Sequence, residues 1–93
     1  MDDLVISWLL APGVCKERIG DDMVLLDTQA GQYFELNDSA ARMVELLDQL
    51  GSTEAVMEAL CEEYEADPDQ LAEELQKLID QLATRQLLIV RQT

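Results

Sequence analysis

Residues 24–47 constrain the fold more than any other part of the chain, because they change periodicity without a linker. The stretch begins as a short apolar run and passes through a turn at residues 27–31, with glycine at its end. Residues 32–36 then alternate, with a period of two, as a strand with one buried face does. From Asn37 onward, apolar residues recur at helical spacing. The stretch predicts a β-hairpin followed directly by a helix.

The sequence before and after this stretch extends the prediction. Residues 14–19 alternate weakly, and the Gly-Asp-Asp that follows them is typical of a turn. We therefore expect an antiparallel meander of three strands at residues 14–19, 23–26 and 32–36, with the third at a sheet edge. Residues 4–11 are apolar and form either a strand or an arm across the domain, and residues 86–90 form a short closing strand.

The third strand of this meander has two distinct faces. Phe34 and Leu36 fall on one face, which we expect to be in the core, and Tyr33 and Glu35 fall on the other. A strand at a sheet edge leaves backbone donors and acceptors unpaired. Such a strand is able to pair with a visiting peptide.

The sequence after residue 37 predicts three helices. Each begins beside a side chain that accepts hydrogen bonds from orphan backbone N–H groups; the candidates are Asn37 or Asp38, Ser52 or Thr53, and Asp67. Gln70 stands at the reciprocal position of a capping box. The third helix carries an apolar seam of Leu71, Leu75, Leu78 and Leu82. Strands followed by helices in 93 residues predict one α+β domain over residues 1–93.

The charge of the chain excludes several kinds of partner. Six basic residues against twenty acidic ones give a net charge of −14. Such a chain repels a phosphate backbone and an anionic membrane surface, so we expect neither nucleic acid nor membrane binding. A guest that carries Lys or Arg would be attracted.

The composition also argues against catalysis and metal binding. The chain has no histidine, and its two cysteines, Cys15 and Cys61, are far apart. This argues against a zinc site and a Cys–His nucleophile. We expect a non-enzyme without cofactor, with both thiols reduced and buried. The acidic start, Met1-Asp2-Asp3, is unlike a signal peptide, and we expect a cytoplasmic protein.

Several segments together resemble the PqqD-like family. They are VLLD at residues 24–27, GQYFELN at residues 31–37, and Ala40-Ala41. The helix that ends at Gly51 and the Leu-rich last helix agree with the resemblance. It implies a winged helix-turn-helix-like fold, in which a three-stranded antiparallel sheet is followed by three helices.

The resemblance also implies a function. Members of this family are recognition elements for ribosomally synthesised, post-translationally modified peptides. They bind the leader segment of a precursor peptide by β-strand addition and present it to a processing enzyme. The chain looks most like the stand-alone proteins of lasso-peptide pathways, which work beside a leader protease. Its expected partners are therefore a precursor peptide and a leader protease or other modifying enzyme, with the chain itself a monomer or homodimer.

The family resemblance places the peptide between the third strand and the third helix. The strand wall would be Gln32, Tyr33, Phe34 and Glu35, and the helical wall would be Leu71, Glu74, Leu75, Leu78 and Gln81. Most of these leucines also suit an ordinary helical core, and Phe34 also suits the core face of its strand. The acidic members would pair with Lys or Arg of the guest, at about 0–1 kcal/mol for each exposed pair.

Three other interpretations remain. A peptide chaperone for a radical-SAM enzyme, as in pyrroloquinoline quinone biosynthesis, fits the same family. An acyl carrier protein modified at Ser39 is suggested by Asp38-Ser39, but Ala40 stands where the carrier motif has leucine. A winged-helix transcription factor would need a basic third helix, whereas this one is acidic.

Overall fold

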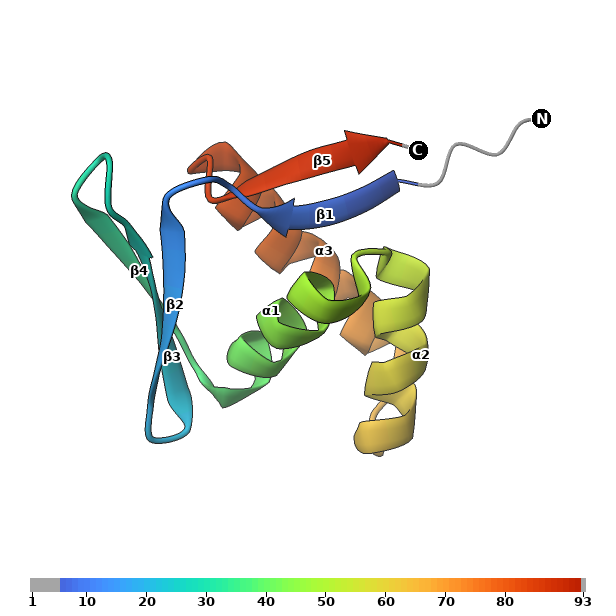
Figure 1. Cartoon of the computed structure of the whole chain (residues 1–93). Helices are drawn as coiled ribbons and strands as arrows, with labels where there is room; N and C mark the ends of the chain where they lie inside the picture. Colours follow the sequence, from blue (N-terminus) through green and yellow to red (C-terminus); the bar gives the residue numbers. More distant parts are fainter. Residues whose placement is uncertain (1–5, 93) are drawn as a thin grey trace.

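The structure, a computed structural model, describes residues 6–92 of the chain. Strands precede and follow a block of three helices (Figure 1). In chain order the elements are β1 (Ile6–Leu10), β2 (Val14–Ile19), β3 (Asp22–Asp27), β4 (Gln32–Leu36), α1 (Asp38–Leu50), α2 (Thr53–Glu63), α3 (Pro68–Thr84) and β5 (Leu88–Gln92). The α+β class and the three predicted helices are confirmed.

The strands form two separate antiparallel sheets. β2, β3 and β4 pair in that order, so the predicted meander is confirmed and β4 lies at its edge. β1 pairs with β5 in a second, two-stranded sheet, with Trp8 opposite Val90. Figure 1 shows this second sheet lying across the helices, at an angle to the first. The sequence left residues 4–11, of which 4 and 5 lie outside the described residues, as either a strand or an arm. It predicted the closing strand at residues 86–90, but not that the two segments pair.

The second sheet is joined to the helices by a backbone hydrogen bond at Gly51. The Trp8 N–H donates to the Gly51 carbonyl at 2.8 Å. Gly51 follows α1 with φ of +81°, a conformation that favours glycine. A Cβ at this position would also lie 3.4 Å from the Cβ of Ser7. Gly51 therefore ends α1, and its lack of a side chain allows the backbone of β1 to lie close to it.

The core lies between the three-stranded sheet and the helices. Met23 and Leu25 of β3 are buried beneath α1, as is Leu36 of β4. From the helices, Val44 and Leu82 are fully buried in the same cluster. Truncating a buried leucine of this kind to alanine costs about 2–5 kcal/mol. This core fixes β4 and α3 relative to one another.

The three helices begin at side-chain caps. Asn37 accepts from the Ala40 N–H at 3.0 Å, and Ser52 accepts from the Ala55 N–H at 3.0 Å. Asp67 accepts from the Asp69 N–H at 3.0 Å. Each bond satisfies one orphan donor of a first turn.

The capping box predicted at Gln70 does not form. Its side-chain amide instead donates to Glu74 at 3.5 Å. These residues are one helical turn apart and lie on the same face of α3. The side chain of Gln70 is therefore directed along the helix toward Glu74, and its carbonyl oxygen does not accept from the Asp67 N–H.

An ion-pair network ties β2, α1 and α2 together. Arg18 of β2 donates to Glu45 of α1 at 3.0 Å. Arg42 of α1 donates to Glu63 of α2 at 2.8 and 2.6 Å and also to Glu45 at 3.3 Å. Hydrogen bonds from Arg18, and then from Arg42, lower the pKa of Glu45. Hydrogen bonds from Arg42 likewise lower the pKa of Glu63.

The prediction of two buried cysteines is wrong, because both thiols are exposed. In β2, Lys16 and Arg18 point inward to reach carboxylates of α1. The alternation of the strand therefore turns Cys15 outward. Cys61 follows the buried Leu60 and falls on the solvent side of α2.

Candidate functional site

The free edge of β4 offers a row of backbone groups to a guest strand. The Thr28 N–H donates to the Gly13 carbonyl at 3.0 Å, directly beyond the paired residues Val14 and Asp27. Bonding alternates along an antiparallel strand. Even-numbered residues of β3 therefore bond β2, and odd-numbered residues bond β4.

The same alternation assigns the backbone groups of β4. Leu25 stands opposite Phe34, and Met23 stands opposite Leu36, so these residues of β4 bond β3. The N–H and C=O groups of Tyr33 and Glu35 then point away from β3. No strand within residues 6–92 pairs with that edge. The edge has the spacing that another strand needs for pairing.

The opposite edge of the sheet, along β2, is less suited to a guest. Lys16 and Arg18 point from this strand toward α1, where they pair with Asp48 at 2.7 Å and Glu45 at 3.0 Å. Inward-pointing charged side chains are a device by which proteins block edge pairing. The arrangement favours β4 over β2 as the place for strand addition.

The third helix runs beside the line of β4. At its C-terminal end, the guanidinium of Arg85 lies 4.9 Å from the centroid of the Phe34 ring. Further back along α3, Gln81 and Lys77 share a hollow with Asn37, which follows β4. The middle of β4 therefore lies near the C-terminal end of α3, and the end of β4 lies near an earlier part of that helix. The two elements lie antiparallel, and a guest on the edge would run alongside α3.

A hollow lies at the end of β4. It has a volume of about 190 Å³ and lies between α1 and α3. We call it the α1–α3 hollow; its lining is Asn37, Ser39, Ala40, Met43, Glu74, Lys77, Leu78 and Gln81. Met43 and Leu78 are buried and form an apolar floor. The hollow suits one apolar side chain with polar groups at its rim.

The predicted strand residues divide between two faces. Phe34 is half-buried and packs against the core, and Gln32 lies at the hairpin end of β4. Tyr33 and Glu35 line a hollow on the outer face of the sheet. Only the backbone groups of these last two residues reach the free edge, while their side chains point away from the core.

The predicted residues of α3 divide in the same way. Glu74, Leu78 and Gln81 line the α1–α3 hollow. Leu71 is buried in the core cluster. Leu75 lines a different hollow, on the side of α3 that faces α2.

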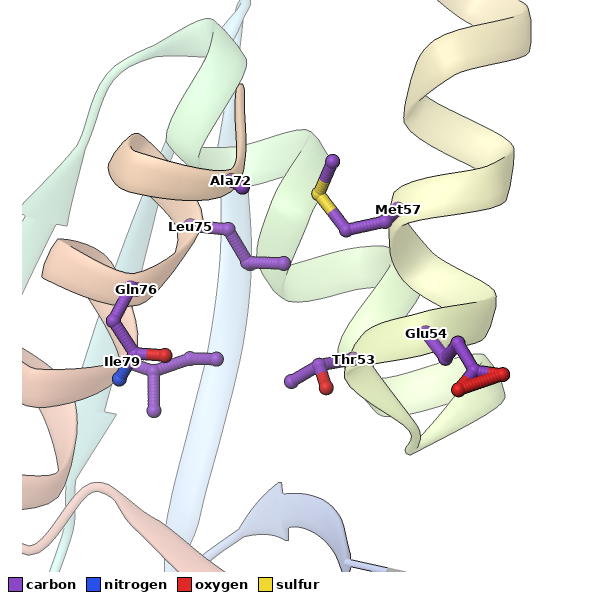
Figure 2. A pocket seen from close by; sticks show the side chains of 7 residues that line it. All are labelled: Thr53, Glu54, Met57, Ala72, Leu75, Gln76 and Ile79. Carbon is purple, nitrogen blue, oxygen red and sulfur yellow. The ribbon is translucent and has the colours of Figure 1, made fainter. Parts of the chain in front are cut away.

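This second helical hollow has a volume of about 320 Å³ and lies between α2 and α3. Figure 2 shows Met57 of α2 and Leu75 of α3 pointing toward one another across it, whereas Glu54 turns away. Because it lies on the side of α3 away from the α1–α3 hollow, it is not continuous with the edge of β4. We call it the α2–α3 hollow.

Sequence reasoning missed two cations of α3 and its cap: Lys77, which lines the α1–α3 hollow, and Arg85, which lies over the ring of Phe34 in β4. Lys77 precedes the predicted Gln81 by four residues, and Arg85 follows it by four. Residues at this spacing share one face of a helix. The spacing from Gln81 was therefore a signal that could have identified both cations.

The outer face of the three-stranded sheet carries an apolar hollow of about 410 Å³. We call it the outer sheet hollow; its lining is Cys15, Glu17, Ile19, Val24, Leu26, Tyr33 and Glu35. Ile19 is 61% exposed, Leu26 42% and Tyr33 66%. Contiguous exposed apolar residues of this kind often mark a protein interface.

Residues 6–92 contain neither of two other kinds of site. Within residues 6–92, no group of three or more His, Cys, Asp or Glu side chains is arranged to hold a metal ion. None of the helices in this part of the chain is long and apolar enough to cross a membrane.

Two solved structures resemble the chain over most of its length. One is "TbiB1 in Complex with the TbiA(beta) Leader Peptide", which is 31% identical with a TM-score of 0.79, and the match covers 86% of this chain and 93% of that one. The other is "Lasso peptide synthetase B1 complexed with the leader peptide", which is 29% identical with a TM-score of 0.79, and the match covers 89% of this chain and 98% of that one. Both relatives were therefore solved with a leader peptide bound.

A comparison with curated proteins finds no match. The sequence profile of the family described as coenzyme PQQ synthesis protein D, PqqD, matches residues 22–88. This match spans β3 through the start of β5, including the free edge of β4 and the whole of α3. The resemblance in sequence and the structural similarity agree: the chain belongs to the PqqD family.

Proposed function

We propose that this protein binds the leader segment of a ribosomally synthesised precursor peptide and presents it to a processing enzyme. The leader adds as a strand to the free edge of β4. The observation that carries the proposal is the outward direction of the Tyr33 and Glu35 peptide groups, which follows from the register of the sheet.

The geometry supports affinity from the backbone and selectivity from side chains. An added strand forms main-chain hydrogen bonds whatever its sequence, and pockets beside it choose among sequences. The α1–α3 hollow, next to the end of β4, supplies such a pocket. Two relatives with the same fold, at 31% and 29% identity, are described as complexes with a leader peptide.

Presentation to an enzyme requires a second surface that a bound leader leaves open. The outer sheet hollow meets this requirement, because the side chains of Tyr33 and Glu35 line it while their peptide groups face the edge. An enzyme docked there through an apolar surface of its own would lie beside a guest on β4. We assign this docking role to Ile19, Leu26 and Tyr33.

A leader protease of a lasso-peptide pathway is the partner we propose. Both structural relatives are described as complexes with a leader peptide, and one of them is described as a lasso peptide synthetase B1. A radical-SAM enzyme is the second candidate, since the matching family profile is described by coenzyme PQQ synthesis. Neither candidate changes the proposed role of the β4 edge.

A binding measurement tests the proposal. The neighbouring genes are first searched for a short precursor, and the leader of that precursor is synthesised with a fluorophore and titrated by fluorescence anisotropy. We expect saturable binding with a Kd of about 1 μM or tighter, equivalent to about 8 kcal/mol. A peptide of the same composition in scrambled order is the control. Equal binding of the two peptides, or no binding of either, would refute leader recognition.

The enzyme partner is tested separately by adding purified leader protease or radical-SAM enzyme to the complex. The proposal predicts a ternary complex with the protease in size-exclusion chromatography. A ternary complex with the radical-SAM enzyme alone would select the second candidate.

A further inference from the structure

The cations of this acidic protein are distributed unevenly. Lys16, Arg18 and Arg42 each form an ion pair with a carboxylate of α1 or α2. Lys77 and Arg85 form none with any residue in the described part of the chain. Both of these cations belong to α3 or its C-terminal cap: Lys77 lines the α1–α3 hollow, and Arg85 lies over Phe34 of β4. We call the strip between these two cations and the free edge of β4 the groove.

The lack of a partner for Lys77 is not explained by a shortage of carboxylates. Glu73, Glu74 and Asp80 all lie three or four residues from it, at the spacing of helical ion pairs. The carboxylate of Glu74 accepts a hydrogen bond from the side-chain amide of Gln70, and that of Asp80 accepts one from Gln76 at 2.9 Å. Lys77 instead lines the α1–α3 hollow, where Glu74 is the one carboxylate of the lining.

Arg85 is held over the ring of Phe34 but retains its hydrogen-bonding capacity. A guanidinium stacked on an aromatic face keeps its N–H groups in the plane, where a carboxylate can be bound by two of them. Glu35, the acidic residue nearest in sequence to this ring, carries its side chain on the outer face of the sheet. The guanidinium of Arg85 is therefore not neutralised from β4.

From this arrangement we infer that the groove selects a guest peptide with acidic side chains directed toward α3. The inference rests on the proposed function and deepens it, by naming Lys77 and Arg85 as residues that determine specificity. It reverses the expectation from net charge, which favoured a basic guest. The net charge of −14 opposes approach at long range, but contacts inside the groove are decided by the nearest charges.

The spacing of the two cations predicts the spacing of the acids. Arg85, the C-cap of α3, lies eight positions after Lys77, a rise of about 12 Å along the helix. Residues i and i+4 of a strand lie on one face and are about 13 Å apart. A guest alongside α3 should therefore place two carboxylates four residues apart, one near each cation.

Display selection tests the inference whatever the natural leader is. A library of random twelve-residue peptides is panned against the wild-type chain. The selected peptides are then titrated against Lys77→Gln/Arg85→Gln and against Gln49→Glu/Ala66→Glu. Both double variants make the net charge two units more negative, but Gln49 and Ala66 are exposed and contribute nothing to the α1–α3 hollow.

We expect the selected peptides to be enriched in Asp or Glu at two positions four residues apart. The groove variant should bind them about tenfold more weakly, and the control variant about as well as the wild type. Selected peptides without acidic enrichment that bind the groove variant equally well would overturn the inference and leave strand addition intact. A selection that yields no binder would refute both.

Discussion

The guanidinium carbon of Arg85 lies 4.9 Å from the centre of the Phe34 ring, which joins the end of α3 to the middle of β4. This contact, together with the hollow shared by α3 and the residues after β4, sets the helix alongside the free strand edge. Exposed cation–π pairs contribute about 0.5–1 kcal/mol. The contact therefore adds little to stability, and its main consequence is to position one wall of the groove.

A proline in β4 should block leader binding where its missing N–H faces the guest. Glu35→Pro removes an outward donor, and we expect the leader affinity to fall at least tenfold. Glu35→Thr removes the same carboxylate but keeps the N–H, so it should bind within about twofold of the wild type. Fluorescence anisotropy measures both affinities, and circular dichroism verifies that each variant is folded. Equal affinities for the two variants would mean that the Glu35 N–H is not used.

Filling the α1–α3 hollow should also prevent binding. Ala40 is a half-buried residue of α1 in its lining, and Ala40→Trp would occupy the hollow with an indole. We expect more than a tenfold loss of leader affinity by anisotropy. Ala72→Trp is the matched control, because Ala72 is an exposed helical alanine that lines the α2–α3 hollow instead. Loss of affinity in the Ala72 variant with retention in the Ala40 variant would place the guest in the α2–α3 hollow and contradict binding beside β4.

The outer sheet hollow should matter for the enzyme but not for the leader. Ile19 is 61% exposed, so Ile19→Asp places a charge in an apolar surface with little cost to folding. We expect leader affinity to be unchanged and co-elution with the leader protease to be lost. Val90→Asp alters another exposed apolar residue, on β5 at 49% exposure, and should retain both activities. Retention of the ternary complex by the Ile19 variant would exclude this face as the docking surface.

The ion pairs of Arg42 should make the free energy of unfolding depend on pH in the acidic range. Arg42→Ala removes hydrogen bonds to Glu63 and Glu45, and we expect a loss of about 1 kcal/mol in the free energy of unfolding at pH 7. Both carboxyls have a lowered pKa in the folded chain. Their contribution is therefore present above the unfolded value of about 4.3 and is lost as the pH falls through the folded value.

Urea unfolding of wild type and Arg42→Ala at several pH values measures this contribution. The difference between the two proteins should be constant from pH 7 down to about pH 5 and should shrink below about pH 4. A difference that grows in acid would contradict the assignment of the network to ionised carboxylates.

The hairpin and the helices were predictable because their signals are local. The alternation around Phe34 fixed which side of β4 is buried, and the side chains of Asn37, Ser52 and Asp67 marked the helix starts. The pairing of β1 with β5 was not predictable in the same way. This pairing joins segments from opposite ends of the chain, and no local pattern within Leu88–Gln92 indicates which strand pairs with it.

The candidate site was predictable only in part for a related reason. Periodicity assigned Leu71, Leu75 and Leu78 to one seam, but a buried seam contacts different neighbours along its length. Packing of α2 places Leu75 beside the α2–α3 hollow, while Leu78 reaches the α1–α3 hollow. The exposure of Cys15 likewise depends on Lys16 and Arg18 reaching α1, which requires the folded arrangement.

Residue-specific amide hydrogen exchange, measured by NMR with and without a saturating display-selected peptide, tests strand addition most directly. In the free protein, the Tyr33 and Glu35 amides should exchange rapidly, while those of Phe34 and Leu36 are protected by β3. In the complex, we predict that the Tyr33 and Glu35 amides become protected as well. Rapid exchange at both amides in a fully occupied complex would contradict the account, because it would place the guest somewhere other than the edge of β4.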